Sequence, residues 1–242
     1  MKDALILGVY MSILGTISSL IGGTLGSICS IKSKKMVSFL YEITAGVMTG
    51  IVCFEMLPES LGMANIIYSV LGICVGVLLI YILDLFIQKL NNKKSQNNSK
   101  IIALVVMLSM AIHNAIEGLA IGSSFVFSIS LGTAVLLGMF LHDIPEGMVV
   151  GITSKIEGKH IKRIIFETSI VGACVGIGTF IGRYLGKINE KYIAISLSIA
   201  AGAMLYLVAC ELIPESKENS KDKKIYLAYI VGIIIGALIS KI

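Results

Sequence analysis

Two neighbouring apolar stretches near the middle of the chain decide its fold class. They read IIALVVMLSMAIHNAIEGLAIGSSFVF over residues 101–127 and SLGTAVLLGMFLHDIPEGMVVGIT over residues 130–153. Each exceeds the roughly 20 apolar residues that a membrane-spanning helix needs. Because almost nothing polar separates the two stretches, they predict a tight hairpin of membrane helices.

The rest of the chain has the same character. Of its 242 residues, 56% are hydrophobic and 14% are charged, against about 45–50% and about 25% in soluble domains. This composition excludes a soluble globule, a nucleic-acid binder and a disordered chain. Six further apolar stretches leave no room for a soluble domain, so we expect an all-α, polytopic membrane protein with a single transmembrane domain over residues 1–242. The eight expected spans are residues 4–30, 36–58, 63–88, 101–127, 130–153, 163–186, 192–214 and 225–240.

The basic residues predict the orientation of these spans. The first stretch follows Lys2, but it is longer than a signal-peptide core of about 7–15 residues, so we interpret it as a true span. With eight spans, the loops after the odd-numbered spans lie on one side, and the positive-inside rule assigns their 15 basic residues to the cytoplasm. Both termini are then outside a multi-pass protein of the cell membrane. These residues are Lys32, Lys34, Lys35, Lys89, Lys93, Lys94, Lys100, Lys155, Lys159, Lys162, Arg163, Lys217, Lys221, Lys223 and Lys224.

The fourth and fifth spans each carry a His and a Glu four residues apart. His113 precedes Glu117, and His142 precedes Glu146. On a helix these positions share one face, so each helix offers an imidazole and a carboxylate to one point. A carboxylate inside a bilayer is costly and usually functional. Nitrogen and oxygen ligands together suit divalent transition metals.

Two more polar residues stand one position after each histidine. Asn114 and Asp143 occupy equivalent places, and their oxygens can reach a second, adjacent point. Pro145 interrupts the fifth span and frees the carbonyl group of Leu141, as in the broken helices that transporters place near a bound ion.

The chain also repeats itself. Residues 45–60, AGVMTGIVCFEMLPES, match residues 201–216, AGAMLYLVACELIPES, and HNAIEG matches HDIPEG. Span two therefore pairs with span seven and span four with span five, so that the pairs nest around the centre of the chain. Because paired spans run in opposite directions, we expect an inverted repeat with its substrate site near the membrane midplane.

The repeated Glu-x-x-Pro-Glu-Ser segments suggest a pathway role. Carboxylates at a pore mouth attract divalent cations. A solvated helix end is the alternative interpretation. We expect these glutamates toward the outer ends of spans two and seven, lining an entrance: Glu55, Glu59, Glu211 and Glu215.

On the motifs HNAIEG, HDIPEG and AGAMLYLVACELIPES, the chain resembles the ZIP family of divalent metal transporters, specifically its bacterial GufA-like branch. The resemblance covers essentially the whole chain. It implies eight spans arranged as 3+2+3, outside termini, import toward the cytoplasm and a homodimer. The metal ligands that it implies are His113, Glu117, His142 and Glu146 for the core, with Met48 as a thioether contact. It also implies a second site of Asn114 and Asp143, bridged by Glu117 and Glu146, with Glu167 of the sixth span as a further carboxylate there. The branch often has Pro after this last carboxylate, whereas this chain has Thr168.

We therefore expect a secondary transporter that imports divalent transition metals, zinc first and also iron, manganese, cobalt or cadmium, across the cytoplasmic membrane through a binuclear site. The metal is cargo, and we expect no resident cofactor. A metal exporter or a passive divalent-cation channel remains as an alternative. An enzyme is not expected: a membrane metalloprotease typically needs His-Glu-x-x-His on one helix, and each helix here has a single His.

Overall fold

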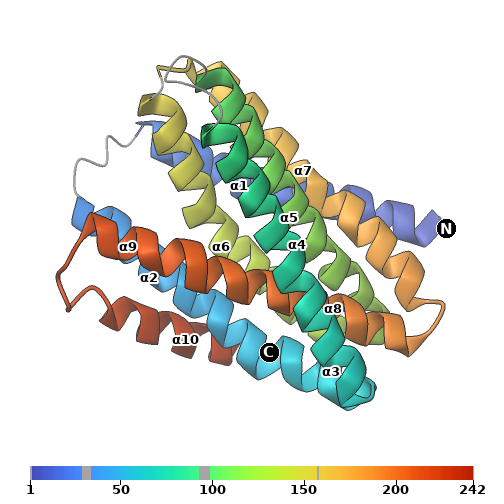
Figure 1. Ribbon diagram of the computed structural model, residues 1–242. Helices are drawn as coiled ribbons and strands as arrows, with labels where there is room; N and C mark the ends of the chain where they lie inside the picture. Colours follow the sequence, from blue (N-terminus) through green and yellow to red (C-terminus); the bar gives the residue numbers. More distant parts are fainter. Residues whose placement is uncertain (1, 29–33, 93–98, 157, 242) are drawn as a thin grey trace.

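The computed structural model describes residues 2–28, 34–92, 99–156 and 158–241, and all regular structure within these ranges is helical (Figure 1). Eight helical rods follow one another, and two of them contain a π-helical segment, written η, between two α-helices. The bounds are α1 Lys2–Ile28; α2 Lys34–Ile51, η1 Val52–Met56 and α3 Leu57–Met63; α4 Ile66–Asn92; α5 Ser99–Phe127; α6 Ile129–Ile156; α7 Ile161–Gly186; α8 Glu190–Leu207, η2 Val208–Leu212 and α9 Ile213–Asn219; and α10 Leu227–Ile239.

The rods coincide to within a few residues with the eight expected stretches, which confirms the all-α, polytopic fold. Six of them are long and apolar enough to cross a membrane. The rod α6 has 28 residues. The rod α10 has 13 residues and so extends about 20 Å. Large apolar side chains such as Leu5 and Ile82 face outward, as lipid contact requires.

The two π-helical segments occupy equivalent places in the sequence repeat. In η1 the amide of Leu57 donates to the carbonyl of Val52, and in η2 the amide of Ile213 donates to the carbonyl of Val208. In each rod the second residue after the π-segment is a proline, Pro58 or Pro214, which has no N–H to donate and clashes with the preceding turn of an α-helix. A π-turn accommodates that proline, and such turns are frequent at functional sites.

The helix packing reveals how the two halves correspond. The helix α5 packs on α7, and its counterpart α6 packs on α1; likewise α2 packs on α10, and α8 packs on α4. These contacts match α1 with α7, α2 with α8, α4 with α10 and α5 with α6. The pairs of spans two with seven and four with five agree with the sequence repeat. The outer spans, however, correspond in chain order rather than in the expected nested order, because a two-fold rotation keeps the N-to-C order of each half.

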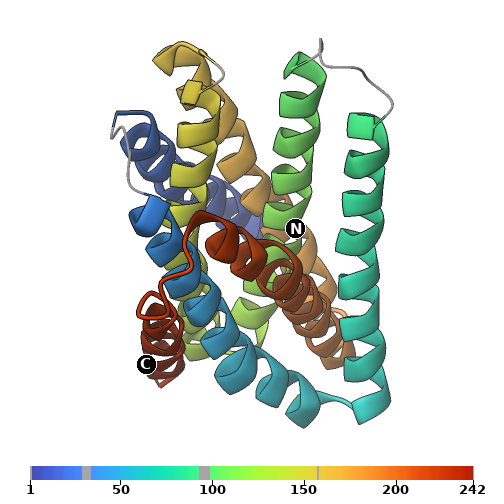
Figure 2. The ribbon, with the colours of Figure 1, turned by 60° about the vertical axis from the view of Figure 1, so that its left-hand side comes forward.

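Glycine contacts hold the helices in two groups. In the first group, α1, α5, α6 and α7 pack together, with Gly15 of α1 against the backbone of Gly172 in α7. In the second group, Gly46 and Gly50 of α2 face the backbones of Gly232 and Gly236 in α10. Figure 2 shows α10 beside α2 on the left and α4 on the right. The helices α5 and α6 of the first group contact α8 and α2 of the second, which places the polar motifs between the groups.

Candidate metal site

The helices α5 and α6 pack against each other and carry the two His-x-x-x-Glu pairs. The imidazole Nε2 of His113 lies 2.9 Å from Oε1 of Glu117, one turn away on α5. The same nitrogen lies 3.8 Å from Oε1 of Glu146 on α6. Three of the four residues expected in the core site therefore converge from two helices. The helical backbone of α6 includes His142, whose side chain lies outside the described residues.

This cluster is shielded from solvent. His113 and Glu117 are each 3% exposed, and the side chain of Glu146 is partly exposed. Both carboxylates lie within 4 Å of one nitrogen atom. Two ionised carboxylates held beside the same buried atom repel each other more strongly than they would in water. A positive charge between them, a proton or a metal cation, relieves that repulsion.

A second set of oxygen atoms lies one residue further along each helix. The amide nitrogen of Asn114 donates to the carbonyl of Val171 at 3.1 Å, which leaves its Oδ1 as a buried acceptor with no hydrogen-bond partner among the described residues. The hydroxyl of Ser18 on α1 donates to Oδ2 of Asp143 at 2.8 Å. Asn114 and Asp143 are thus both oriented by neighbouring helices.

These residues line one small cavity of about 10 Å³. Asn114, Asp143 and Glu146 contribute oxygens to its wall, and Ser19 and Thr168 add hydroxyl groups. Its size matches one water-sized particle. Glu146 is the residue that this cavity shares with the core cluster.

The structure places Glu167 in a different environment. Its carboxylate accepts from Lys159 Nζ at 3.0 Å and from Arg163 Nε at 2.9 Å. The adjacent Thr168, rather than Glu167, lines the cavity. The proposed role of Glu167 as a ligand stays a prediction, and it requires the carboxylate to leave two cations.

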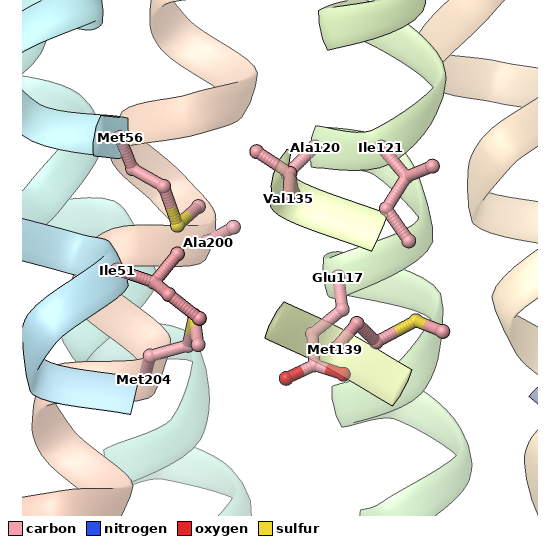
Figure 3. A pocket seen from close by; sticks show the side chains of 9 residues that line it. All are labelled: Ile51, Met56, Glu117, Ala120, Ile121, Val135, Met139, Ala200 and Met204. Atoms are coloured by element: carbon pink, nitrogen blue, oxygen red, sulfur yellow. The ribbon is translucent and has the colours of Figure 1, made fainter. Parts of the chain in front are cut away.

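The methionine expected from the sequence lies in the core. Met48 is buried among apolar side chains, and neither cavity is lined by it among the described residues. Its counterpart in the repeat, Met204, lines a separate cavity beside Glu117 (Figure 3). The sequence repeat placed Met48 and Met204 in equivalent positions, but nothing in the sequence favoured Met204 over Met48 as the residue that lines a cavity. Ser18 had no sequence signal, because it reaches Asp143 from a helix 125 residues away.

Serine hydrogen bonds fix how the two repeated segments lie. Near the start of α2, the Ser38 hydroxyl lies 2.8 Å from that of Ser216 in α9. At the other end, the Ser60 hydroxyl in α3 donates to the carbonyl of Ala194 in α8 and contacts the Ser198 hydroxyl. The two rods therefore run antiparallel, with α3 and α9 at opposite ends.

The expectation of one shared entrance is consequently wrong in its geometry. The glutamates next to Pro58 lie at one end of the antiparallel pair of rods, and those next to Pro214 lie at the other. Each pair of glutamates occupies the same place in its own rod, toward the C-terminal end. Because the two rods are antiparallel, these ends lie apart. The role of each pair in a pathway stays a prediction for Glu55, Glu59, Glu211 and Glu215.

Comparison with known proteins identifies the family of the chain. Residues 89–240 match the family model described as ZIP Zinc transporter. The chain belongs to this family. It is similar to the zinc transporter GufA of Myxococcus xanthus, with 31% identity over 138 residues, which cover 57% of this chain and 54% of that protein. It is similar to the zinc transporter ZupT of Chlorobaculum parvum, with 28% identity over 99% of this chain and 96% of that protein.

More distant members of the ZIP family also match. The metal cation symporter ZIP14 of Xenopus tropicalis is 26% identical over 122 residues, which cover 50% of this chain and 26% of that protein. The similarity to ZupT thus extends over nearly the whole chain, whereas the matches to GufA and ZIP14 cover about half of it.

Proposed function

We propose that this chain is a secondary transporter that imports divalent transition metals, zinc first, across the cytoplasmic membrane. The observation that carries the proposal is the convergence of the carboxylates of Glu117 and Glu146 within 4 Å of the buried Nε2 atom of His113. Membership of the ZIP family supports transport of a divalent metal rather than catalysis.

The ligand chemistry supports a divalent metal. One imidazole and two carboxylates supply nitrogen and oxygen donors, which suit zinc, iron and manganese. A divalent cation also balances the two carboxylate charges, which a monovalent ion would leave half compensated. We assign His113, Glu117, His142 and Glu146 to the first metal position of a binuclear site.

The second metal position in this proposal is formed by Asn114 and Asp143. Glu146 belongs to both clusters and so serves as the bridge between them. The fixed hydrogen bonds of Asn114 to Val171 and of Asp143 to Ser18 hold the oxygens in place before metal arrives. We assign this second position an auxiliary role that tunes rate and metal choice.

The test is uptake of radioactive zinc into liposomes that contain the purified chain. His113→Ala and Glu117→Ala should abolish saturable uptake, because they remove ligands of the first position. His160 is the matched control: it is an exposed histidine at the N-cap of α7, and His160→Ala should transport like the parent. Uptake at parental rates in both site variants, at matched protein amounts, would refute the assignment.

The same vesicles separate the alternatives. A carrier saturates with zinc concentration, whereas a passive channel gives uptake that rises linearly. An exporter would accumulate zinc only in vesicles that expose the opposite face. Reactivity of a cysteine placed at either terminus in intact cells tests our proposal that both termini are outside, and the mass of the purified protein in nanodiscs tests the proposed homodimer.

A further inference from the structure

The helix α2 carries a buried threonine hydroxyl outside the set of expected ligands. Thr44 is 3% exposed, and its Oγ1 has no hydrogen-bond partner among the residues that the structure describes. A threonine hydroxyl on a helix often donates to the carbonyl group four residues earlier, as that of Thr49 does to Ala45 at 2.8 Å. A buried hydroxyl without a partner destabilises a fold, whereas an apolar side chain of the same shape does not. The position of Thr44 therefore calls for a functional explanation.

The relation between the two halves of the chain indicates what this hydroxyl faces. Thr44 immediately precedes the repeated stretch in α2, and Ala200 immediately precedes its match in α8. Ala200 lines a small cavity together with Glu117 of α5 (Figure 3). Because α2 corresponds to α8 and α6 corresponds to α5, the same relation sets Thr44 beside Glu146, the counterpart of Glu117.

Contacts of α2 support this placement. Ile51 lies two turns after Thr44 on the same face of the helix, and it packs on Gly138 of α6 so closely that a Cβ atom would not fit there. Tyr41 lies one turn before Thr44, and it is close enough to Glu146 for electrostatic interaction. The face of α2 that carries Thr44 is therefore turned toward α6 and the carboxylate of Glu146.

An oxygen atom of α2 would approach the proposed first metal position from a different group of helices. His113 and Glu117 lie on α5 and Glu146 lies on α6, and both helices belong to the first group. The helix α2 belongs to the second group and packs on α6. A hydroxyl adds a neutral oxygen donor. Manganese prefers oxygen ligands in octahedral coordination, whereas softer metals gain less from such a donor.

We propose that Thr44 is a further, selectivity-determining residue of this metal position, and that its hydroxyl oxygen contacts the ion held by His113, Glu117 and Glu146. The inference rests on the proposed function and extends it to the choice of metal. The hydroxyl favours manganese over cadmium, and the contact joins the ion to both groups of helices. The hydroxyl is kept unpaired in the fold because the ion is its partner.

The experiment removes the hydroxyl while keeping the shape of the side chain. In liposomes that contain Thr44→Val, the KM for manganese uptake should rise about fivefold, with kcat little changed, because a contact to the bound ion is lost. The KM for cadmium should stay close to that of the parent. Thr44→Ser keeps a hydroxyl and should restore the KM for manganese. Thr179→Val is the matched control, because Thr179 is also fully buried but its hydroxyl donates to the carbonyl of Val175 at 2.9 Å.

A second measurement works without transport. Without metal, Thr44→Val should melt at the parental temperature or above it, since it removes an unpaired polar group, yet manganese should stabilise it less than it stabilises the parent. A parental KM and a parental stabilisation by manganese in Thr44→Val would overturn the proposal. An equal rise of KM in Thr44→Ser would also overturn it, because packing rather than the hydroxyl would then be responsible. If the parent transports no metal but loses its stabilisation by manganese in Thr44→Val, the transport function fails while the role of Thr44 in binding holds.

Discussion

A methyl group added at Gly147 should displace the proposed metal site without removing any of its proposed ligands. Gly147 follows Glu146 on α6 and faces α1. A Cβ atom there would meet the carbonyl oxygen of Ser19 at 2.7 Å, the amide nitrogen of Gly23 at 3.1 Å and the Cα of Gly22 at 3.2 Å. All three are backbone atoms, so no side chain can turn away to make room.

The size of the displacement follows from these contacts. Side-chain Cβ atoms rarely come closer than 3.0–3.4 Å to a neighbour, so α6 must retreat from Ser19 by 0.3–0.7 Å. Overpacking of this kind costs about 1–3 kcal/mol, and the better helix propensity of alanine returns about 1 kcal/mol. The net loss of stability should therefore lie between about 0 and 2 kcal/mol. Because binding sites need their ligands within about 0.5 Å of the productive geometry, zinc uptake by Gly147→Ala should fall about tenfold.

The assay measures the initial rate of zinc uptake and the melting temperature of the same purified protein. Gly62→Ala is the matched control, since Gly62 is also helical and nothing lies within 4 Å of its added Cβ. That control should keep the parental rate and melt at the same or a slightly higher temperature. A parental rate and melting temperature in Gly147→Ala would refute the reasoning, because the spacing of α1 and α6 would then not constrain the site.

Three further outcomes are expected. Asp143→Asn and Ser18→Ala should change the rate and metal preference of uptake while transport persists, and a complete loss of transport in Asp143→Asn would show that the second position is not auxiliary. Zinc uptake with equal pH on both sides should weaken as the pH falls from 7.5 to 5, because metal ligands bind deprotonated; an apparent affinity that stays constant over this range would contradict Glu117 as a ligand. The ammonium group of Lys35 donates to Asp222 and lowers the pKa of that carboxyl group below its usual value. The ion pair should therefore stabilise the fold at pH values above about 3.9, the pKa of an aspartate in the unfolded chain. This contribution is lost as the pH falls through the lower pKa of Asp222 in the folded protein. Lys35→Ala should accordingly change the melting temperature more at neutral pH than at pH 2.

The sequence predicted features that lie within a single helix. The i, i+4 spacing of His113 and Glu117 predicted a shared face, and the two side chains lie 2.9 Å apart. The repeat at an offset of 156 residues predicted equivalent rods, and both contain a π-turn before proline. Helical periodicity and local proline chemistry depend on neighbours in the chain, so they can be read without the fold.

Contacts between residues of different helices were less predictable from the sequence. The resemblance to the ZIP family implied that Glu167 is a ligand at the proposed second metal position. In the structure, however, Lys159 and Arg163 hold its carboxylate and Thr168 lines the cavity. Adjacent residues on a helix point about 100° apart, so the rotation of α7 about its own axis decides which of the two faces the site. Apolar composition alone contains no information about that rotation.

The sequence by itself determined the all-helical membrane fold, the eight stretches and the pairing of the polar motifs, because each follows from apolar length and helical period. Only the tertiary structure decided that the repeated glutamates lie at opposite ends, that Ser18 orients Asp143, and that Met139 and Met204 both border a cavity beside Glu117. The physical reason is the register between helices. It is set where glycines let backbones touch, as Gly147 does against Ser19, and such contacts join residues that are far apart in the chain.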